Sequence, residues 1–155
     1  MSSLGLVFKE DWTLENTEGT EGESAQASGH VDARYKHSDL TDKIIRCAYQ
    51  VHATLGCGFA EKVYENALAA ELSDAGLSVV QQRPIEVCYN GRNVGDYLAD
   101  VVVEEKVIVE VKAVSGIDRV HEVQLVNYLK ATHIEVGLLL NFGRELQIKR
   151  KIFDQ

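Results

Sequence analysis

Cysteine is scarce in this sequence, and the few cysteines present show no pattern that would build a disulfide framework or a zinc site. Three occur in 155 residues, Cys47, Cys57 and Cys88, and no two of them form a Cys-x-x-Cys pair. Structural zinc sites and disulfide-rich domains require closely spaced or paired cysteines. We therefore expect reduced, partly buried thiols.

Long hydrophobic runs are also missing. No stretch approaches the roughly 18 consecutive apolar residues of a membrane-spanning helix, and residues 1–12 lack the basic start and apolar run of a signal peptide. The composition, 45% hydrophobic and 26% charged, is that of a soluble globular chain, and the length suits one ordinary domain. We therefore expect a cytoplasmic protein with no membrane partner.

Positive charge is in deficit, because the formal net charge is −8. That value argues against a broad phosphate-binding surface. Residues 1–37 hold three Lys/Arg against seven Asp/Glu, and residues 38–155 hold thirteen against seventeen, so each part carries −4. If three or four carboxylates of the second part bind metal, that part is close to neutral. Net charge therefore weakens the expectation of nucleic-acid binding without excluding it.

The chain divides into an acidic segment and an ordered domain. Residues 13–33 are rich in Glu, Gly, Ser, Thr and Ala and have few large apolar side chains, so burial cannot offset the entropy of ordering. We expect residues 1–37 to form a mostly disordered tail, in which Leu4–Phe8 docks transiently as a strand. Residues 38–155 form the domain.

The domain starts with two helices and continues mainly with strands. Ser38 is the expected N-cap of a first helix that ends at Gly56, and a second helix spans about residues 60–75. Strands are expected at 78–82, 84–90 and 92–103, with a hairpin turn at Asn90-Gly91, and then at 106–114, 135–142 and 146–153, after a helix at 118–132. This order predicts a mixed α/β domain with a partly antiparallel sheet.

Two charged residues, Glu110 and Lys112, share one face of the otherwise apolar strand VIVEVKAV at residues 107–114. If the turn at 104–106 has three residues, Asp100 lies directly opposite Glu110. With a two-residue turn the two carboxylates are diagonal neighbours. Like charges that face each other in a half-buried sheet repel, and a divalent cation between them would remove the penalty.

These residues predict a metal site. Asp100 and Glu110 would hold Mg²⁺ or Mn²⁺, which prefer carboxylate and water oxygens. The carbonyl of Val111 would be a further ligand. Lys112 would orient a water molecule and stabilise charge on a reacting phosphate. The alternative is an ordinary Glu–Lys surface face on an edge strand.

The spacing Asp100-x9-Glu110-Val111-Lys112 resembles the D…(D/E)-x-K signature of the PD-(D/E)XK nuclease superfamily. Residues 58–64 contain Gly-x-x-Glu-x-x-Tyr and resemble the motif of the GxxExxY family, a group within that superfamily. Residues 124–128, Gln-x-x-x-Tyr, resemble the corresponding motif of RecB-type nucleases. The resemblance covers about residues 40–153 and implies a restriction-endonuclease-like α/β core, with a mixed central sheet whose β-meander is flanked by helices.

The resemblance also implies roles for helical residues. Glu61 would be an additional acidic ligand and catalytic residue beside Asp100 and Glu110. Tyr64 lies on the same helical face, although it could instead be a core aromatic. The third helix would present His121, Gln124 and Tyr128 to a phosphate or to the end of a nucleic-acid strand.

Other polar residues have more ordinary interpretations. His52 could join the site, but a partly buried structural histidine is the favoured reading. Cys57 stands between two glycines where the resemblance leads us to expect proline. The basic run at residues 149–151 either contacts a nucleic-acid backbone or, as we favour, guards an exposed edge strand.

The leading functional prediction is a metal-dependent nuclease that acts on DNA or RNA with Mg²⁺ or Mn²⁺. The alternative is a catalytically silent module of the same fold that binds protein or nucleic acid, which the acidic charge favours. A third hypothesis, an unrelated enzyme with a His52 or Cys57 nucleophile, has little support. The small size of the domain favours a homodimer, since one copy would cover little duplex.

Overall fold

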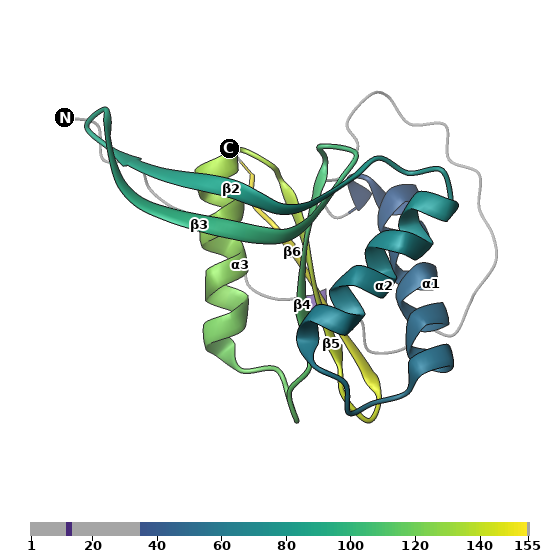
Figure 1. Cartoon of the computed structure of the whole chain (residues 1–155). Helices are drawn as coiled ribbons and strands as arrows, with labels where there is room; N and C mark the ends of the chain where they lie inside the picture. The colour runs from purple at the N-terminus through teal and green to yellow at the C-terminus, as the bar shows by residue number, and fades with distance from the viewer. Residues whose placement is uncertain (1–11, 14–34, 155) are drawn as a thin grey trace.

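The computed structural model describes residues 12–13 and 35–154, and a six-stranded mixed sheet forms its centre (Figure 1). The elements are β1 (Trp12–Thr13), α1 (Ser38–Leu55), α2 (Glu61–Asp74), β2 (Val79–Tyr89), β3 (Arg92–Val103), β4 (Val107–Lys112), α3 (Arg119–Thr132), β5 (Val136–Phe142) and β6 (Leu146–Ile152). The strand order is β1-β6-β5-β4-β3-β2. Only β4 and β5 are parallel. The predicted mixed α/β fold with a β-meander is confirmed.

Most of the predicted acidic tail lies outside the described residues. Residues 1–11 and 14–34 are not described, and the strand expected at Leu4–Phe8 falls among them. Trp12 and Thr13 form β1, which pairs with Arg150 and Lys149 of β6. β6, predicted as an edge strand, therefore has a short neighbour on its outer side.

The helices cover both faces of the sheet, with α1 and α2 on one face and α3 on the other (Figure 1). This division follows from strand alternation, since successive side chains point to opposite faces. Val107, Val109 and Val111 pack under α1 and α2, whereas Ile108 packs under α3. Both clusters consist of buried side chains, and the residues that β4 and β5 contribute are almost wholly buried on both faces, which explains why these strands are apolar at almost every position.

Two tight turns set the register of the meander. Asn90 and Gly91 both have positive φ, 48° and 74°, as a two-residue hairpin turn of this kind requires. The second turn has three residues, 104–106, because Val103 pairs with Val107 and Val101 pairs with Val109. The structure thus confirms the three-residue alternative that the sequence left open.

A β-bulge shifts the pairing of β2 with β3 near the hairpin turn. Cys88 pairs with Asn93, but Val87 pairs with Gly95, so Val94 is an extra residue in β3. In Figure 1 the two strands continue past α3 as an extended arm. Every β2–β3 pair from Val87–Gly95 to Val79–Val103 is therefore displaced by one residue from the register that the turn sets.

The first helix begins differently from the prediction. His37, with φ of 55°, occupies the N-cap position, and no side chain caps the helix there. The His37 carbonyl already accepts the first helical hydrogen bond from Thr41 N–H at 2.9 Å, so Ser38 is the first helical residue and not the cap. The second helix starts and ends within one residue of the predicted bounds.

The remaining compositional expectations can also be compared with the structure. All three cysteines are free, with Cys47 buried and Cys57 and Cys88 exposed. The absence of disulfides among them is as predicted, although only one thiol is buried. In the described part of the chain no helix combines the length and apolarity needed to cross a membrane.

Gly137 of β5 lies against α3, and we predict that Gly137→Ala destabilises the domain. An added Cβ would lie 2.7 Å from Leu125 Cδ1, and Leu125 is fully buried, so the core would have to shift. We expect a loss of about 1–3 kcal/mol in the free energy of unfolding, measured by urea titration. Gly116→Ala is the control, because nothing lies within 4 Å of its added Cβ. Equal stability of the two variants would contradict the prediction.

Candidate functional site

A row of polar side chains crosses the three strands of the meander at the same level. Glu110 lies opposite Asp100, because the β3–β4 pairs that start at Val103–Val107 and reach Val101–Val109 continue in the same register. Gln81 pairs with Val101 and Arg83 with Ala99, so Gln82 lies on the other side of Asp100. One residue from each strand, Gln82, Asp100 and Glu110, therefore forms the row.

Asp100 and Glu110 are joined by reciprocal hydrogen bonds. The backbone N–H of Asp100 donates to Glu110 Oε1 at 3.2 Å. In return, the backbone N–H of Val111 donates to Asp100 Oδ2 at 2.9 Å. Each carboxylate is thus bonded to the other residue's strand, and this arrangement fixes the two acidic groups beside each other.

Burial makes this pair electrostatically unfavourable. Glu110 is only 3% exposed. Burial, followed by the charge of Asp100, raises the pKa of Glu110 to about 9, although the charge of Lys112 acts in the opposite direction. The surface alternative from the sequence does not hold, because Glu110 is buried and β4 lies in the interior of the sheet.

The donor set fits a hard divalent cation. Mg²⁺ is commonly bound by one or two carboxylates and completes its shell with water or substrate oxygens. Within residues 35–154, no three His, Cys, Asp or Glu side chains lie close enough together to enclose a metal ion. Asp100 and Glu110 therefore supply two carboxylates, and Glu61 does not complete a cluster of three. The Val111 carbonyl as a ligand stays a prediction.

Glu61, the first residue of α2, lies within electrostatic range of this pair. Burial raises the pKa of Glu61, the charge of Lys112 lowers it, and the nearby charge of Asp100 raises it further. Lys112, the last residue of β4, thus acts on both Glu61 and Glu110. The helix and the two strands bring together the four residues that the sequence proposed as catalytic.

Glu65 is a site residue that the sequence analysis missed. It is 3% exposed and lies one helical turn after Glu61. Its Oε1 accepts hydrogen bonds from Lys62 Nζ at 2.9 Å and from Gln81 Nε2 at 3.1 Å. Burial alone would raise the pKa of Glu65, but hydrogen bonds from Lys62, Gln82 and Gln81 outweigh it and lower the pKa. The i, i+4 spacing from Glu61 was the available signal.

Gln82 is the second missed residue, and its side-chain amide joins Glu65 to Asp100. Gln82 Nε2 lies 3.0 Å from each carboxylate oxygen of Glu65 and 3.5 Å from Asp100 Oδ1. Its φ is 52°, in the left-handed region that residues other than glycine seldom adopt. No local sequence signal marks this conformation.

Gln124 and Tyr128 of α3 lie beside the carboxylates. Gln124 Nε2 donates to the Tyr128 hydroxyl at 2.8 Å. Burial, followed by the charge of Glu110, raises the pKa of Tyr128, and Asp100 adds to this effect. Gln124 and Tyr128 are therefore hydrogen-bonded to each other, and Tyr128 lies within electrostatic range of Glu110 and Asp100.

His121 has a structural contact that the sequence analysis did not foresee. Its Nδ1 accepts a hydrogen bond from Asp118 N–H at 3.1 Å, while Asp118 Oδ1 accepts from Val120 N–H at 3.1 Å, and the two side chains cap α3. Its imidazole nevertheless lies within electrostatic range of Glu61. A contact of His121 with a phosphate stays a prediction.

Tyr64 does not belong to the group of site residues, because it is fully buried on the α1–α2 side of the sheet. Its hydroxyl donates to the Gly56 carbonyl at 2.6 Å and accepts from Phe59 N–H at 3.3 Å, and its ring stacks on Phe142. Tyr64 thus fastens the loop that leads into Glu61. The core-aromatic alternative describes it better than a binding role.

His52 is also outside the group. Its Nε2 lies 2.8 Å from the Gly143 carbonyl oxygen, a hydrogen bond that ties α1 to the β5–β6 turn. The favoured structural reading of His52 is therefore supported.

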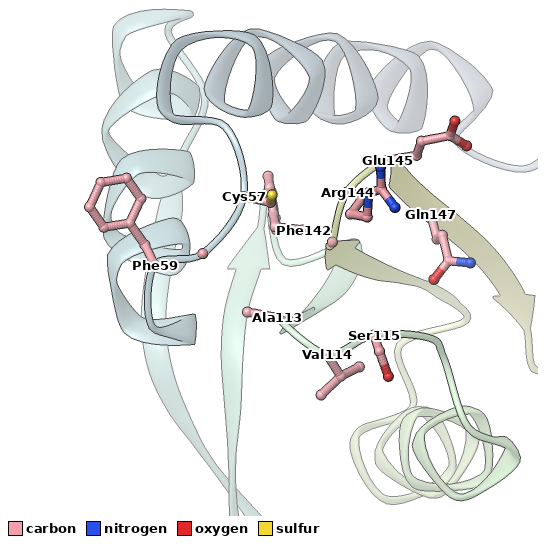
Figure 2. Close-up of a pocket in the computed structure, with 11 residues that line it drawn as sticks. Cys57, Phe59, Ala113, Val114, Ser115, Phe142, Arg144, Glu145 and Gln147 are labelled. Atoms are coloured by element: carbon pink, nitrogen blue, oxygen red, sulfur yellow. The ribbon is translucent and has the colours of Figure 1, made fainter.

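An open cavity of about 770 Å³ lies where β4 ends, directly after Lys112. Three loops surround it: the loop before α2, the loop after β4 and the β5–β6 turn (Figure 2). Its lining residues are Cys57, Gly58, Phe59, Ala113, Val114, Ser115, Phe142, Gly143, Arg144, Glu145 and Gln147. Lys112 and the carboxylates of Asp100, Glu110 and Glu61 are not among the residues that line it.

The basic run at residues 149–151 is partly engaged in packing. Lys151 forms an ion pair with Glu122 of α3 at 2.5 Å, and Arg150 donates to the Lys36 carbonyl at 2.5 Å. These contacts attach β6 to its neighbours and do not leave the run as a freely exposed cationic surface.

Comparison with known proteins identifies one family. The family described as "PD-(D/E)XK nuclease superfamily" matches residues 38–152. No curated protein matches the chain. A solved structure named "Crystal structure of SSO0001" is similar, with 19% sequence identity and a TM-score of 0.46. The similarity covers 79% of this chain and 61% of that one, so the chain spans less than two thirds of that structure's length.

The buried pair generates a prediction about stability. In the presence of a chelator, Glu110→Gln should stabilise the protein, because it removes an acid whose charged form is disfavoured by burial and by Asp100. Below pH 4.5 the carboxyl is protonated in the folded and the unfolded chain alike. Between pH 4.5 and about 9 only the folded chain keeps the proton, so the wild type loses stability as pH rises.

The gain from Glu110→Gln should therefore grow from pH 5 to pH 9 and reach about 5 kcal/mol, measured by urea titration at each pH. Glu86→Gln, on the exposed arm, is the matched control and should change stability little at any pH. A gain that stays constant with pH would show that Glu110 does not titrate as stated.

Proposed function

The chain belongs to the PD-(D/E)XK nuclease superfamily, and we propose that it is a metal-dependent nuclease that hydrolyses phosphodiester bonds in DNA or RNA. The observation that carries this proposal is the reciprocal bonding of Asp100 and Glu110 beside Lys112. Burying an acid beside a second carboxylate reduces stability, so the presence of this pair is best accounted for by a function that needs both acids. The motif at residues 58–64 further supports membership of the GxxExxY group.

In the proposed mechanism, Asp100 and Glu110 hold Mg²⁺ or Mn²⁺. The bound ion would polarise the scissile phosphate and lower the pKa of a coordinated water. Both carboxyls must be ionised to bind it, so Glu110 releases its proton on binding. The Lys112 ammonium stabilises the additional negative charge that develops on the phosphate.

The other residues would act on either side of this centre. Glu61 is a candidate acidic partner for a water in the ion's shell, because its carboxyl lies in the field of Lys112 and Asp100. The hydroxyl of Tyr128, hydrogen-bonded by Gln124, is a candidate contact for a phosphate oxygen.

A catalytically silent module that binds protein or nucleic acid is the second candidate. The net charge of −8 favours it, since nonspecific affinity for nucleic acid depends on neutralising phosphates with Lys and Arg. Such a module would keep the fold, and its binding would not depend on Lys112. The two candidates therefore differ in what the Lys112→Ala variant does.

We predict that the wild-type protein cleaves at least one of four labelled substrates, single- or double-stranded DNA or RNA, with Mg²⁺ or Mn²⁺. Lys112→Ala and Asp100→Asn should lower the rate at least about 100-fold, because they remove charge stabilisation and a metal ligand. Lys43→Ala, the same change on the exposed surface of α1, should retain the rate. Cleavage that is equal in all variants would indicate a contaminating nuclease and would contradict the proposal.

A binding measurement gives a readout that does not depend on activity. We expect millimolar Mn²⁺ to raise the thermal midpoint of the wild type, because an ion that binds only the folded state stabilises it. The shift should vanish in Asp100→Asn and persist in Lys43→Ala. No shift in the wild type at millimolar Mn²⁺ would favour the silent module.

A further inference from the structure

Asp100 occupies an interruption in the sheet. The β2–β3 pairing passes from Gln81–Val101 to Arg83–Ala99, and Gln82 and Asp100 do not pair through their backbones. The β3–β4 pairing ends at Val101 and likewise leaves Asp100 out. Because Asp100 is not part of either ladder, its N–H donates to the Glu110 side chain. In a regular ladder this N–H would donate to the backbone of a neighbouring strand.

The side chains along β3 also change faces at this point. Val101 packs with α1 and α2, whereas Ala99, two residues earlier, packs with α3. In a regular strand, residues two apart share a face. The strand therefore turns at Asp100, next to the left-handed Gln82 of β2.

A non-glycine residue with this φ is strained and persists only where its surroundings hold it. The group that holds Gln82 is the Glu65 carboxylate. Both of its oxygens lie 3.0 Å from Gln82 Nε2. Glu65 is itself fixed by hydrogen bonds from Lys62 and Gln81.

We propose that Glu65 and Gln82 are positioning residues that orient the Asp100 carboxylate for metal binding. Glu65 holds the Gln82 amide against Asp100 Oδ1, and the left-handed backbone of Gln82 opens the ladder so that Asp100 can bond Glu110. Neither residue touches the metal. The inference rests on the proposed function, because it assigns the two residues a role at that metal site.

Mn²⁺ titration followed by electron paramagnetic resonance tests this assignment. Glu65→Gln and Gln82→Gly should weaken Mn²⁺ binding about 10–100-fold, the usual effect of removing a group that orients a metal ligand. Gln82→Gly keeps the positive φ and loses only the amide, so it separates the hydrogen bonds from the backbone conformation. Gln82→Asn, which keeps an amide and tolerates positive φ, should recover part of the affinity.

The control is Glu71→Gln, the same substitution further along α2, which should bind Mn²⁺ like the wild type. Wild-type affinity in Gln82→Gly would overturn the proposal. So would a complete loss in Glu65→Gln with unchanged Gln82 variants, because that result would make Glu65 a direct ligand. If the nuclease is active, kcat should fall in the Glu65→Gln and Gln82→Gly variants while KM for the nucleic acid stays unchanged.

A metal-free measurement separates this proposal from the proposed function. In ¹H–¹⁵N spectra, Glu65→Gln should shift the side-chain amide signals of Gln82 and the backbone signal of Asp100. If the wild type binds no Mn²⁺ but these signals shift, the metal-dependent function fails and the positioning of Asp100 stands. Unchanged signals would overturn the positioning role even if the nuclease is active.

Discussion

The two hydrogen bonds that join Asp100 to β4, one to the Glu110 carboxyl and one from the Val111 N–H, are the constraint on which the candidate site depends. They keep two carboxyl groups together at a buried position, where desolvation and mutual repulsion disfavour the ionisation of both. The surrounding fold holds the two carboxyl groups in place despite this cost. β4 is fixed between β3 and the parallel β5, and α3 covers the face that Glu110 occupies. Moving either strand would break both bonds at once.

The polar groups around this pair form two layers with different tasks. Lys112, Glu61 and Tyr128 lie within electrostatic range of the carboxylates, where charge would develop in the proposed phosphodiester hydrolysis. Behind them, Gln82 of β2 contacts Asp100, and Glu65 of α2 contacts Gln82. The proposed division is between residues that meet the substrate or metal and residues that hold a ligand in place, as is common at metal sites.

The Gly-x-x-Glu-x-x-Tyr motif has a mechanical explanation in this fold. Tyr64 is buried and bonds the Gly56 carbonyl, so the loop before α2 is fixed to the core. Glu61 follows that loop directly and begins α2. The tyrosine therefore serves the site by fixing the position at which the helix starts. The sequence could not distinguish this role from ligand binding, because both require Tyr64 on the same helical face as Glu61.

The sequence by itself determined the elements and the central pair. Strand alternation and the turn at residues 104–106 are local, and together they place Asp100 opposite or diagonal to Glu110. Helical spacing likewise fixed Gln124 beside Tyr128. Only the tertiary structure decided which residue lies on the other side of Asp100. If the register set by the Asn90-Gly91 turn continued without interruption, Gln81 would lie beside Asp100. The bulge at Val94 shifts the register by one residue, so Gln82 lies there instead. Bulges and left-handed residues depend on packing between distant segments, so no local pattern revealed them.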